Sequence, residues 1–249
     1  MASGRRPKYQ LIADALREAI HTGRYGPGDR LPGENDLMAE HRVARMTARQ
    51  ALGVLQAEGL TETRKGAGVF VRAFRPVRRQ GIGRVARAEW GSGRSVWDGD
   101  IEDRHLTVDE IVVREEPAPE RIAAVLGLDA GEPVCVRSRR YVLDGKPVLL
   151  ATSYLPGALV AGSPVTWPDP GPGGIYARLA ELGHAPARFR EEVRARMPSQ
   201  EEAGRLGLGS GVPVVLVCRT AYTEPARAVE VNEMVLDSAA YILEYGFEA

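Results

Sequence analysis

The sequence contains few of the residues that metal centres and disulfide frameworks require. Its 249 residues include two cysteines and four histidines, and the histidines at positions 21, 41, 105 and 184 have no spacing typical of a ligand set. Cys135 and Cys218 both lie in apolar, strand-like segments, so we expect them to be buried free thiols. We therefore expect no structural metal and no cofactor.

Long apolar runs and catalytic signatures are also missing. No stretch of about 18 apolar residues occurs, and the N-terminal sequence MASGRRPKYQ lacks the apolar core of a secretion signal. We expect a cytoplasmic protein without a membrane partner. The sequence has no Gly-x-Ser-x-Gly elbow, no Walker loop and no carboxylate pair at a spacing typical of acid–base catalysis, so we expect no enzymatic activity.

Charge is balanced in total but distributed unevenly. The formal net charge is zero, whereas residues 1–80 contain 15 Lys or Arg against 8 Asp or Glu, and the remainder contains 18 against 25. A basic N-terminal module on an acidic remainder is expected where only one end of a protein meets a phosphate backbone. The chain is long enough for two domains.

The basic N-terminal part has three amphipathic helical patterns followed by a hairpin. Apolar residues recur at helical spacing over 11–20, 34–41 and 44–57, and two strand-like segments follow, joined by the glycine-containing tip RKGAG. This layout is typical of a winged helix-turn-helix, which binds double-stranded DNA. The candidate DNA-contacting residues lie in the second helix, near the start of the third helix and in the tip: Asn35, Arg45, Thr47, Arg49, Gln50, Lys65, Gly66 and Gly68.

Four short motifs in this part occur in the order found in one family. LPGENDL, RMTARQAL, AEGL and GAG resemble the DNA-binding domain of the GntR family of bacterial transcription regulators over about sixty residues. The resemblance implies that Arg45, Thr47, Arg49 and the wing contact DNA. Two positions depart from the family pattern, because Asn35 replaces the usual arginine and Ala44 replaces a serine or threonine.

The rest of the chain predicts a linker and a second domain. Residues 76–103 are rich in glycine and arginine and lack periodicity, so we expect the domains to comprise residues 1–75 and 104–249. The second domain alternates strand-like segments with short helical ones, which indicates an α+β fold with an antiparallel sheet. The expected strands are 107–114, 134–143, 147–155, 188–196, 214–223, 228–236 and 241–247, and the expected helices are 119–126, 174–182 and 199–206.

This second domain resembles the UTRA effector domain of the HutC-type branch of the GntR family. The resemblance is carried by RRYVLDGKPVLLATSYLP, GIYARL, the EEA helix and VEV near the end of the chain. It implies a chorismate-lyase-like antiparallel sheet with flanking helices, a cleft for a small effector, and a homodimer.

Departures from the family pattern bear on the effector. Members that sense phosphosugars usually have two arginines one residue apart on the first hairpin strand, and we assign that pair here to Arg139 and Tyr141. Gly174 stands for a serine and Ala151 for a glutamate, so we expect the effector not to be a phosphosugar. The candidate effector-binding residues are Arg139, Tyr141, Ser153, Gly174, Tyr176, Phe189, Glu191, Glu230 and Asn232, with Arg140 as a further polar anchor.

These features together predict a homodimeric transcriptional regulator. We expect a repressor that binds a palindromic operator and is released by a small molecule. A DNA-binding or plasmid-maintenance repressor without ligand control is the alternative, and a small-molecule lyase-like enzyme is the least favoured hypothesis.

Overall fold

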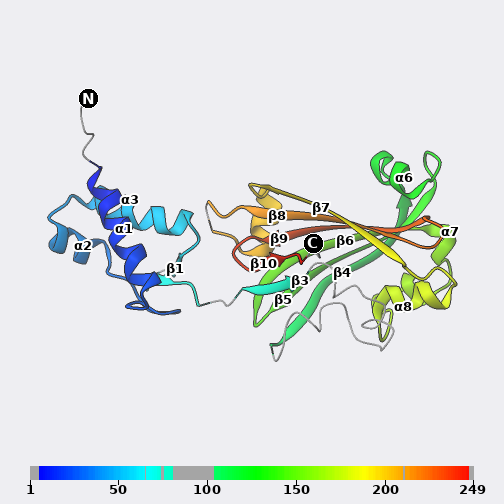
Figure 1. Ribbon diagram of the computed structural model, residues 1–249, viewed down its shortest axis with the longest axis horizontal. Coiled ribbons are helices and arrows are strands. Elements are labelled where there is room, and N and C mark those ends of the chain that lie inside the picture. Colours follow the sequence, from blue (N-terminus) through cyan, green and yellow to red (C-terminus); the bar gives the residue numbers. More distant parts are fainter. Residues whose placement is uncertain (1–5, 65, 74–75, 81–103, 210, 247–249) are drawn as a thin grey trace. The chain divides into compact units, whose positions relative to one another are not determined.

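The computed structural model describes residues 6–64, 66–73, 76–80, 104–209 and 211–246 (Figure 1). The chain divides into two compact units, one comprising Met1–Arg75 with Gly209–Val212 and the other Pro76–Leu208 with Pro213–Ala249. Lys65 and residues 81–103, which include most of the predicted linker, lie outside the described residues.

Three helices form the core of the first unit. They are α1 (Lys8–His21), α2 (Glu34–His41) and α3 (Arg45–Ala57). α2 begins after Gly33, whose N–H donates to the Asp36 carboxylate at 2.9 Å and so closes the first turn. The apolar faces of the helices meet in one buried cluster, which contains Ile12, Ala13, Leu16, Leu31, Leu37, Ala48, Ala51, Leu52, Leu55 and Val71.

A two-stranded wing follows these helices, as the sequence predicts. β1 (Thr61–Arg64) pairs antiparallel with β2 (Gly68–Val71). Gly68 has a φ of +118°. A Cβ at Gly68 would lie 3.0 Å from Nε of Arg30, which forms a β-bridge with Phe70. Gly68 is therefore required by the backbone of the wing itself.

The second unit is built on a six-stranded antiparallel sheet. The strand order is β4-β5-β6-β9-β8-β7, and the strands are β4 (Leu106–Pro117), β5 (Pro133–Leu143), β6 (Lys146–Pro156), β9 (Ala228–Asp237), β8 (Val214–Tyr222) and β7 (Arg188–Arg196). Asp144 and Gly145 connect β5 to β6 with φ of +50° and +78°, the conformation expected of an Asp-Gly hairpin. These observations confirm the predicted α+β fold.

Different helices cover the two faces of this sheet. α6 (Glu120–Leu126) and α9 (Gln200–Leu206) pack on the face that presents Val136 and Leu150. α8 (Gly174–Glu181) packs on the opposite face, where Cys135 and Leu155 lie. The short α7 (Gly157–Val160) and the 3-10 helix Pro164–Thr166 lie in the connection before α8. In Figure 1, α6, α7 and α8 gather at one end of the sheet.

One small sheet differs from the sequence prediction. β3 (Val77–Gln80) pairs in parallel with β10 (Tyr241–Glu244), although the sequence places 77–80 in the linker and 241–247 in the antiparallel sheet. The pairing involves segments at opposite ends of the second unit, so neither segment carries a local signal for it. None of the described helices is long and apolar enough to span a membrane.

Candidate DNA-binding surface and effector cavity

The N-terminal end of α3 presents a polar surface next to α2. The side chains of Arg45 and Arg49 are 60% and 61% exposed, Gln50 is exposed and Thr47 is half-buried. Arg45 donates from Nη2 to Oδ1 of Asn35 at 3.1 Å. The structure thus brings Asn35 on α2 together with the predicted residues of α3.

Glu34 of α2 also belongs to this polar surface, and the sequence interpretation missed it. Nε of Arg49 donates to Oε1 of Glu34 at 2.7 Å, and Nη2 donates to Oε2 at 3.3 Å. Hydrogen bonding to Arg49 lowers the pKa of the Glu34 carboxyl. Glu34 and Arg49 are 15 residues apart, so no helical spacing within one element could have predicted their contact.

The second unit contains a cavity of about 800 Å³ on the α8 face of the sheet. Its walls come from the sheet, including the edge strand β4, from the Pro168–Gly173 loop and from the start of α8. Six of the predicted effector residues line the cavity, namely Arg139, Tyr141, Gly174, Tyr176, Glu230 and Asn232. The further lining residues used below are Val108, Ile111, Arg137, Arg219 and Met234.

A continuous row of polar residues crosses the sheet beneath the cavity. Backbone register places one such residue from each of five strands side by side. In spatial order these residues are Arg137, Ser153, Asn232, Arg219 and Glu191. All except Glu191 are at most 5% exposed, and the Glu191 side chain is 10% exposed. Side chains at directly opposed positions of a sheet share a face, so the row forms a buried polar floor.

Arg137 is a cavity arginine that the sequence interpretation missed. Arg137, Arg139 and Tyr141 lie on one face of β5, and all three line the cavity. The Arg137 guanidinium donates to the backbone carbonyls of Val165, Trp167 and Pro168. It therefore fixes the start of the loop that walls the cavity. Burial lowers the pKa of Arg137, and the neighbouring Arg139 lowers it further.

Arg139 is a half-buried cation of the cavity wall, whereas Arg137 and Arg219 are buried. It donates to the Tyr141 hydroxyl at 2.8 Å, to Oγ of Ser153 at 3.1 Å and to the Arg137 carbonyl at 3.2 Å. Ser153 does not line the cavity but holds Arg139 from below. Arg140 points to the opposite face, because successive side chains of a strand alternate, and it binds both carboxylate oxygens of Asp109 at 2.8 Å. The structure therefore contradicts Arg140 as a polar anchor for an effector.

Tyr176 and Glu230 form a buried pair on the cavity wall. The Tyr176 hydroxyl donates to Oε2 of Glu230 at 2.7 Å, and burial together with the Glu230 charge raises the pKa of Tyr176. Oε1 of Glu230 and Oδ1 of Asn232 are buried without a hydrogen-bond partner among the described residues. Phe189 does not line the cavity but packs against Tyr176, with ring centroids 5.3 Å apart.

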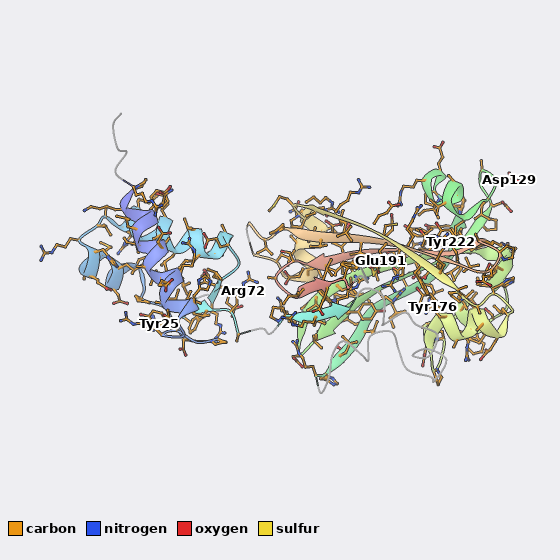
Figure 2. The ribbon with its side chains drawn as sticks, viewed as in Figure 1. Tyr25, Arg72, Asp129, Tyr176, Glu191 and Tyr222 are labelled. Carbon is orange, nitrogen blue, oxygen red and sulfur yellow. The ribbon has the colours of Figure 1, made fainter. Side chains whose placement is uncertain are left out.

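Glu191 lies behind the cavity wall and does not line it. Its Oε1 accepts hydrogen bonds from Arg219 and from Arg79 of β3, and its Oε2 accepts from Tyr245. Figure 2 labels Glu191 on β7 and Tyr176 on α8. The sequence interpretation missed Arg219 and Arg79, since Arg219 lies within an apolar strand and Arg79 within the predicted linker. Among the described residues, no cluster of His, Cys, Asp or Glu is suited to hold a metal ion.

Comparison with known proteins identifies both units. Residues 8–71 match the model of bacterial regulatory proteins of the gntR family, and residues 102–242 match the UTRA domain. An HTH-type transcriptional regulator of Streptomyces coelicolor is 34% identical, with 97% of this chain and 93% of that protein covered. The HTH-type transcriptional repressor PhnF of Mycolicibacterium smegmatis is 30% identical, covering 92% of this chain and 89% of PhnF.

Solved structures show the same two-domain fold. The crystal structure of PhnF from Mycobacterium smegmatis covers 98% of this chain and 99% of its own, with a TM-score of 0.59 and 26% identity. A protein described as a GntR-family regulator reaches a TM-score of 0.66 at 28% identity, with 98% of both chains covered. The protein therefore belongs to the UTRA-containing branch of the GntR family, a family of DNA-binding transcriptional regulators with a ligand-binding domain and not of enzymes.

Proposed function

We propose that this regulator is an effector-responsive repressor that binds a palindromic operator as a homodimer in the cytoplasm and is released by a small molecule. Two related proteins are named as transcriptional repressors, PhnF and the NagR protein of Bacillus subtilis. The proposed DNA-binding residues are Asn35, Arg45, Thr47, Arg49, Gln50, Lys65, Gly66 and Gly68. Exposed guanidinium groups at the start of a recognition helix are suited to read guanine edges in the major groove.

The observation that carries effector control is the cavity with its buried charges. Arg137, Arg139 and Arg219 line it, and the carboxylates of its described lining are Glu230 and the exposed Asp169. Buried cations that outnumber nearby carboxylates favour an anionic ligand, because an uncompensated buried charge is costly. We therefore propose an organic anion as the effector.

Two further features of the cavity restrict this ligand. The unpartnered acceptors on Glu230 and Asn232 require hydrogen-bond donors, so the anion should also carry hydroxyl or amino groups. Apolar wall is supplied by Val108, Ile111 and Met234. The expectation that phosphosugars are excluded depended on three missing polar groups, and Arg137 offers a second cavity arginine where one of them was counted as lost. We accordingly withdraw the charge argument against a sugar phosphate.

Two adjacent arginines of β5 allow a controlled test. The full-length protein is titrated onto its own promoter DNA by fluorescence anisotropy, with and without a panel of hydroxylated or aminated organic acids and sugar phosphates. We expect one compound to release the wild-type protein. The Arg139→Ala protein should bind the operator but resist release, whereas Arg140→Ala, altered on the opposite face, should respond like the wild type.

The outcomes separate the remaining hypotheses. Release of Arg139→Ala at the wild-type ligand concentration would remove this arginine from the effector site. Operator binding that no compound in the panel changes would support a repressor without ligand control. Lack of preference for promoter DNA over scrambled DNA would contradict the operator-binding role itself.

A further inference from the structure

A single carboxylate joins the effector cavity to β3. Oε1 of Glu191 accepts hydrogen bonds from Nε and Nη2 of Arg219 at 2.8 and 2.6 Å, and from Nη2 of Arg79 at 2.7 Å. Arg219 lines the cavity, whereas Arg79 belongs to β3. Two guanidinium groups from different elements therefore share one carboxylate oxygen.

Arg79 is unusually poorly satisfied for a buried arginine. It is 1% exposed, and its Nε and Nη1 have no hydrogen-bond partner among the described residues. Burial lowers the pKa of Arg79, and repulsion from Arg219 lowers it further. A planar guanidinium normally binds both oxygens of a carboxylate through two parallel hydrogen bonds. Arg79 reaches only Oε1 of Glu191, which it shares with two hydrogen bonds from Arg219, while Oε2 accepts from Tyr245.

The competition for Glu191 involves the strand that directly follows the DNA-binding unit in the chain. The first unit ends at Arg75 and the second begins at Pro76, so β3 is the first strand after the DNA-binding unit. β3 is held by its parallel pairing with β10 and by Arg79. Tyr245, directly after β10, also donates to Glu191, at 3.0 Å. Glu191 thus holds both strands of the small sheet.

We propose that an anion bound to Arg219 in the cavity releases Glu191 to Arg79 and thereby fastens β3 to the effector domain. The inference rests on the proposed function, because it uses the cavity as an anion site. Arg219 exchanges one carboxylate partner for the ligand, while Arg79 gains the second hydrogen bond that it lacks. The ligand thus binds more tightly to the state in which β3 is fastened, which is the differential affinity that a switch requires.

The proposal is tested without a known effector by removing the competitor of Arg79. In full-length Arg219→Gln, Glu191 is left to Arg79 and Tyr245, as it would be when a ligand holds Arg219. Amide hydrogen exchange of residues 77–80 is measured relative to the central strand β6, which corrects for a change in global stability. We expect exchange in β3 to slow about fivefold or more, a typical size for coupling between sites.

Two further variants show whether the effect passes through Arg79. In Arg79→Gln/Arg219→Gln, exchange in β3 should be no slower than in Arg79→Gln alone. Arg137→Gln removes another buried arginine of the same polar row without touching Glu191, and it should leave the β3 to β6 ratio unchanged. Arg219→Lys is measured in parallel, since it keeps a buried cation and costs less stability.

The results decide the proposal independently of DNA binding. Slower β3 exchange in Arg219→Gln or Arg219→Lys that disappears without Arg79 supports it. Faster or unchanged exchange in both variants overturns it, as does an equal effect of Arg137→Gln. The measurement uses neither operator nor effector. Its result can therefore be distinguished from a failure of the proposed repressor function.

Discussion

At the scale of single residues, the arginines of α3 that are proposed to contact DNA are held by an acid in the free protein. Arg49 binds Glu34, and Arg45 lies 3.7 Å from the same carboxylate. The contact restrains two exposed guanidinium groups, which lowers the entropy that would be lost on binding a base edge. In the proposed complex, Glu34 and DNA phosphates or bases would compete for the same donors.

This competition leads to a prediction for Arg49. The Arg49→Ala protein should bind its operator about 1–3 kcal/mol more weakly, since it loses a bidentate donor to a base pair. Anisotropy titrations against operator and scrambled DNA measure both the affinity and its specificity.

Glu34→Gln is the matched control for this prediction. It releases Arg49 without removing it, so operator binding should persist, and binding to scrambled DNA should increase because one negative charge is lost. Equal operator affinity in the wild-type and Arg49→Ala proteins would show that Arg49 does not read the operator.

At the scale of elements, α9 depends on one ionised side chain. Glu202 accepts the N–H of its N-cap residue Ser199 and both terminal nitrogens of Arg196, each at 2.7 Å. Hydrogen bonding to Arg196 lowers the pKa of Glu202 from 4.5 to about 2. A carboxyl with a depressed folded-state pKa contributes stability that is complete above its unfolded pKa and is lost as the pH falls through the folded value.

The corresponding prediction compares wild type with Glu202→Gln. Glutamine can keep the capping hydrogen bond but cannot keep the charge, so the variant should be less stable at pH 7. The difference in the free energy of unfolding should shrink as the pH falls from about 4.5 towards 2. Urea unfolding at several pH values measures it, and a difference that stays constant with pH would contradict the assigned ionic role.

The sequence predicts those elements whose ends are set by residues close in the chain, such as turn residues and helix caps. The Asp144–Gly145 turn joins two of the predicted strands, and Ser199 forms a capping box with Glu202 at the start of a predicted helix. The β3–β10 pair was not predicted, because its partners are distant. Arg78 and Glu244, for example, form a contact across 166 positions. Pairing of that kind depends on the folded chain and leaves no short-range pattern.

The cavity was predictable to a similar extent. Alternation along β5 places Arg137 and Arg139 on one face, but it does not show which face the Pro168–Gly173 loop covers. In the sequence, Arg219 is a single charged residue within an apolar strand. Its partner Glu191 is 28 residues away, so no local pattern predicts their contact. The sequence therefore predicts which side chains of one strand share a face. It does not predict how the strands combine into one polar floor.

At the scale of the whole molecule, the proposed operator symmetry can be measured directly. Light scattering of the free protein should give twice the mass of one chain, and titration should give two chains per palindromic duplex. Half-sites should be spaced about one helical turn, or about 10 base pairs, apart. A duplex with one half-site destroyed should bind much more weakly. A monomeric mass together with full affinity for the single half-site would contradict a symmetric dimer.

The sheet of the second unit divides two tasks between its faces. On β5, on β6 and on β9 from Glu230 onward, residues with one parity line or support the cavity, and those with the other parity face α6 and α9. Neighbouring codons thus encode residues under different constraints. One set determines the chemistry of the cavity, and the other set determines the packing of the fold. Diversity confined to alternate codons would retune the sensor for a new metabolite while leaving its scaffold intact, which makes this domain a practical starting point for biosensor libraries.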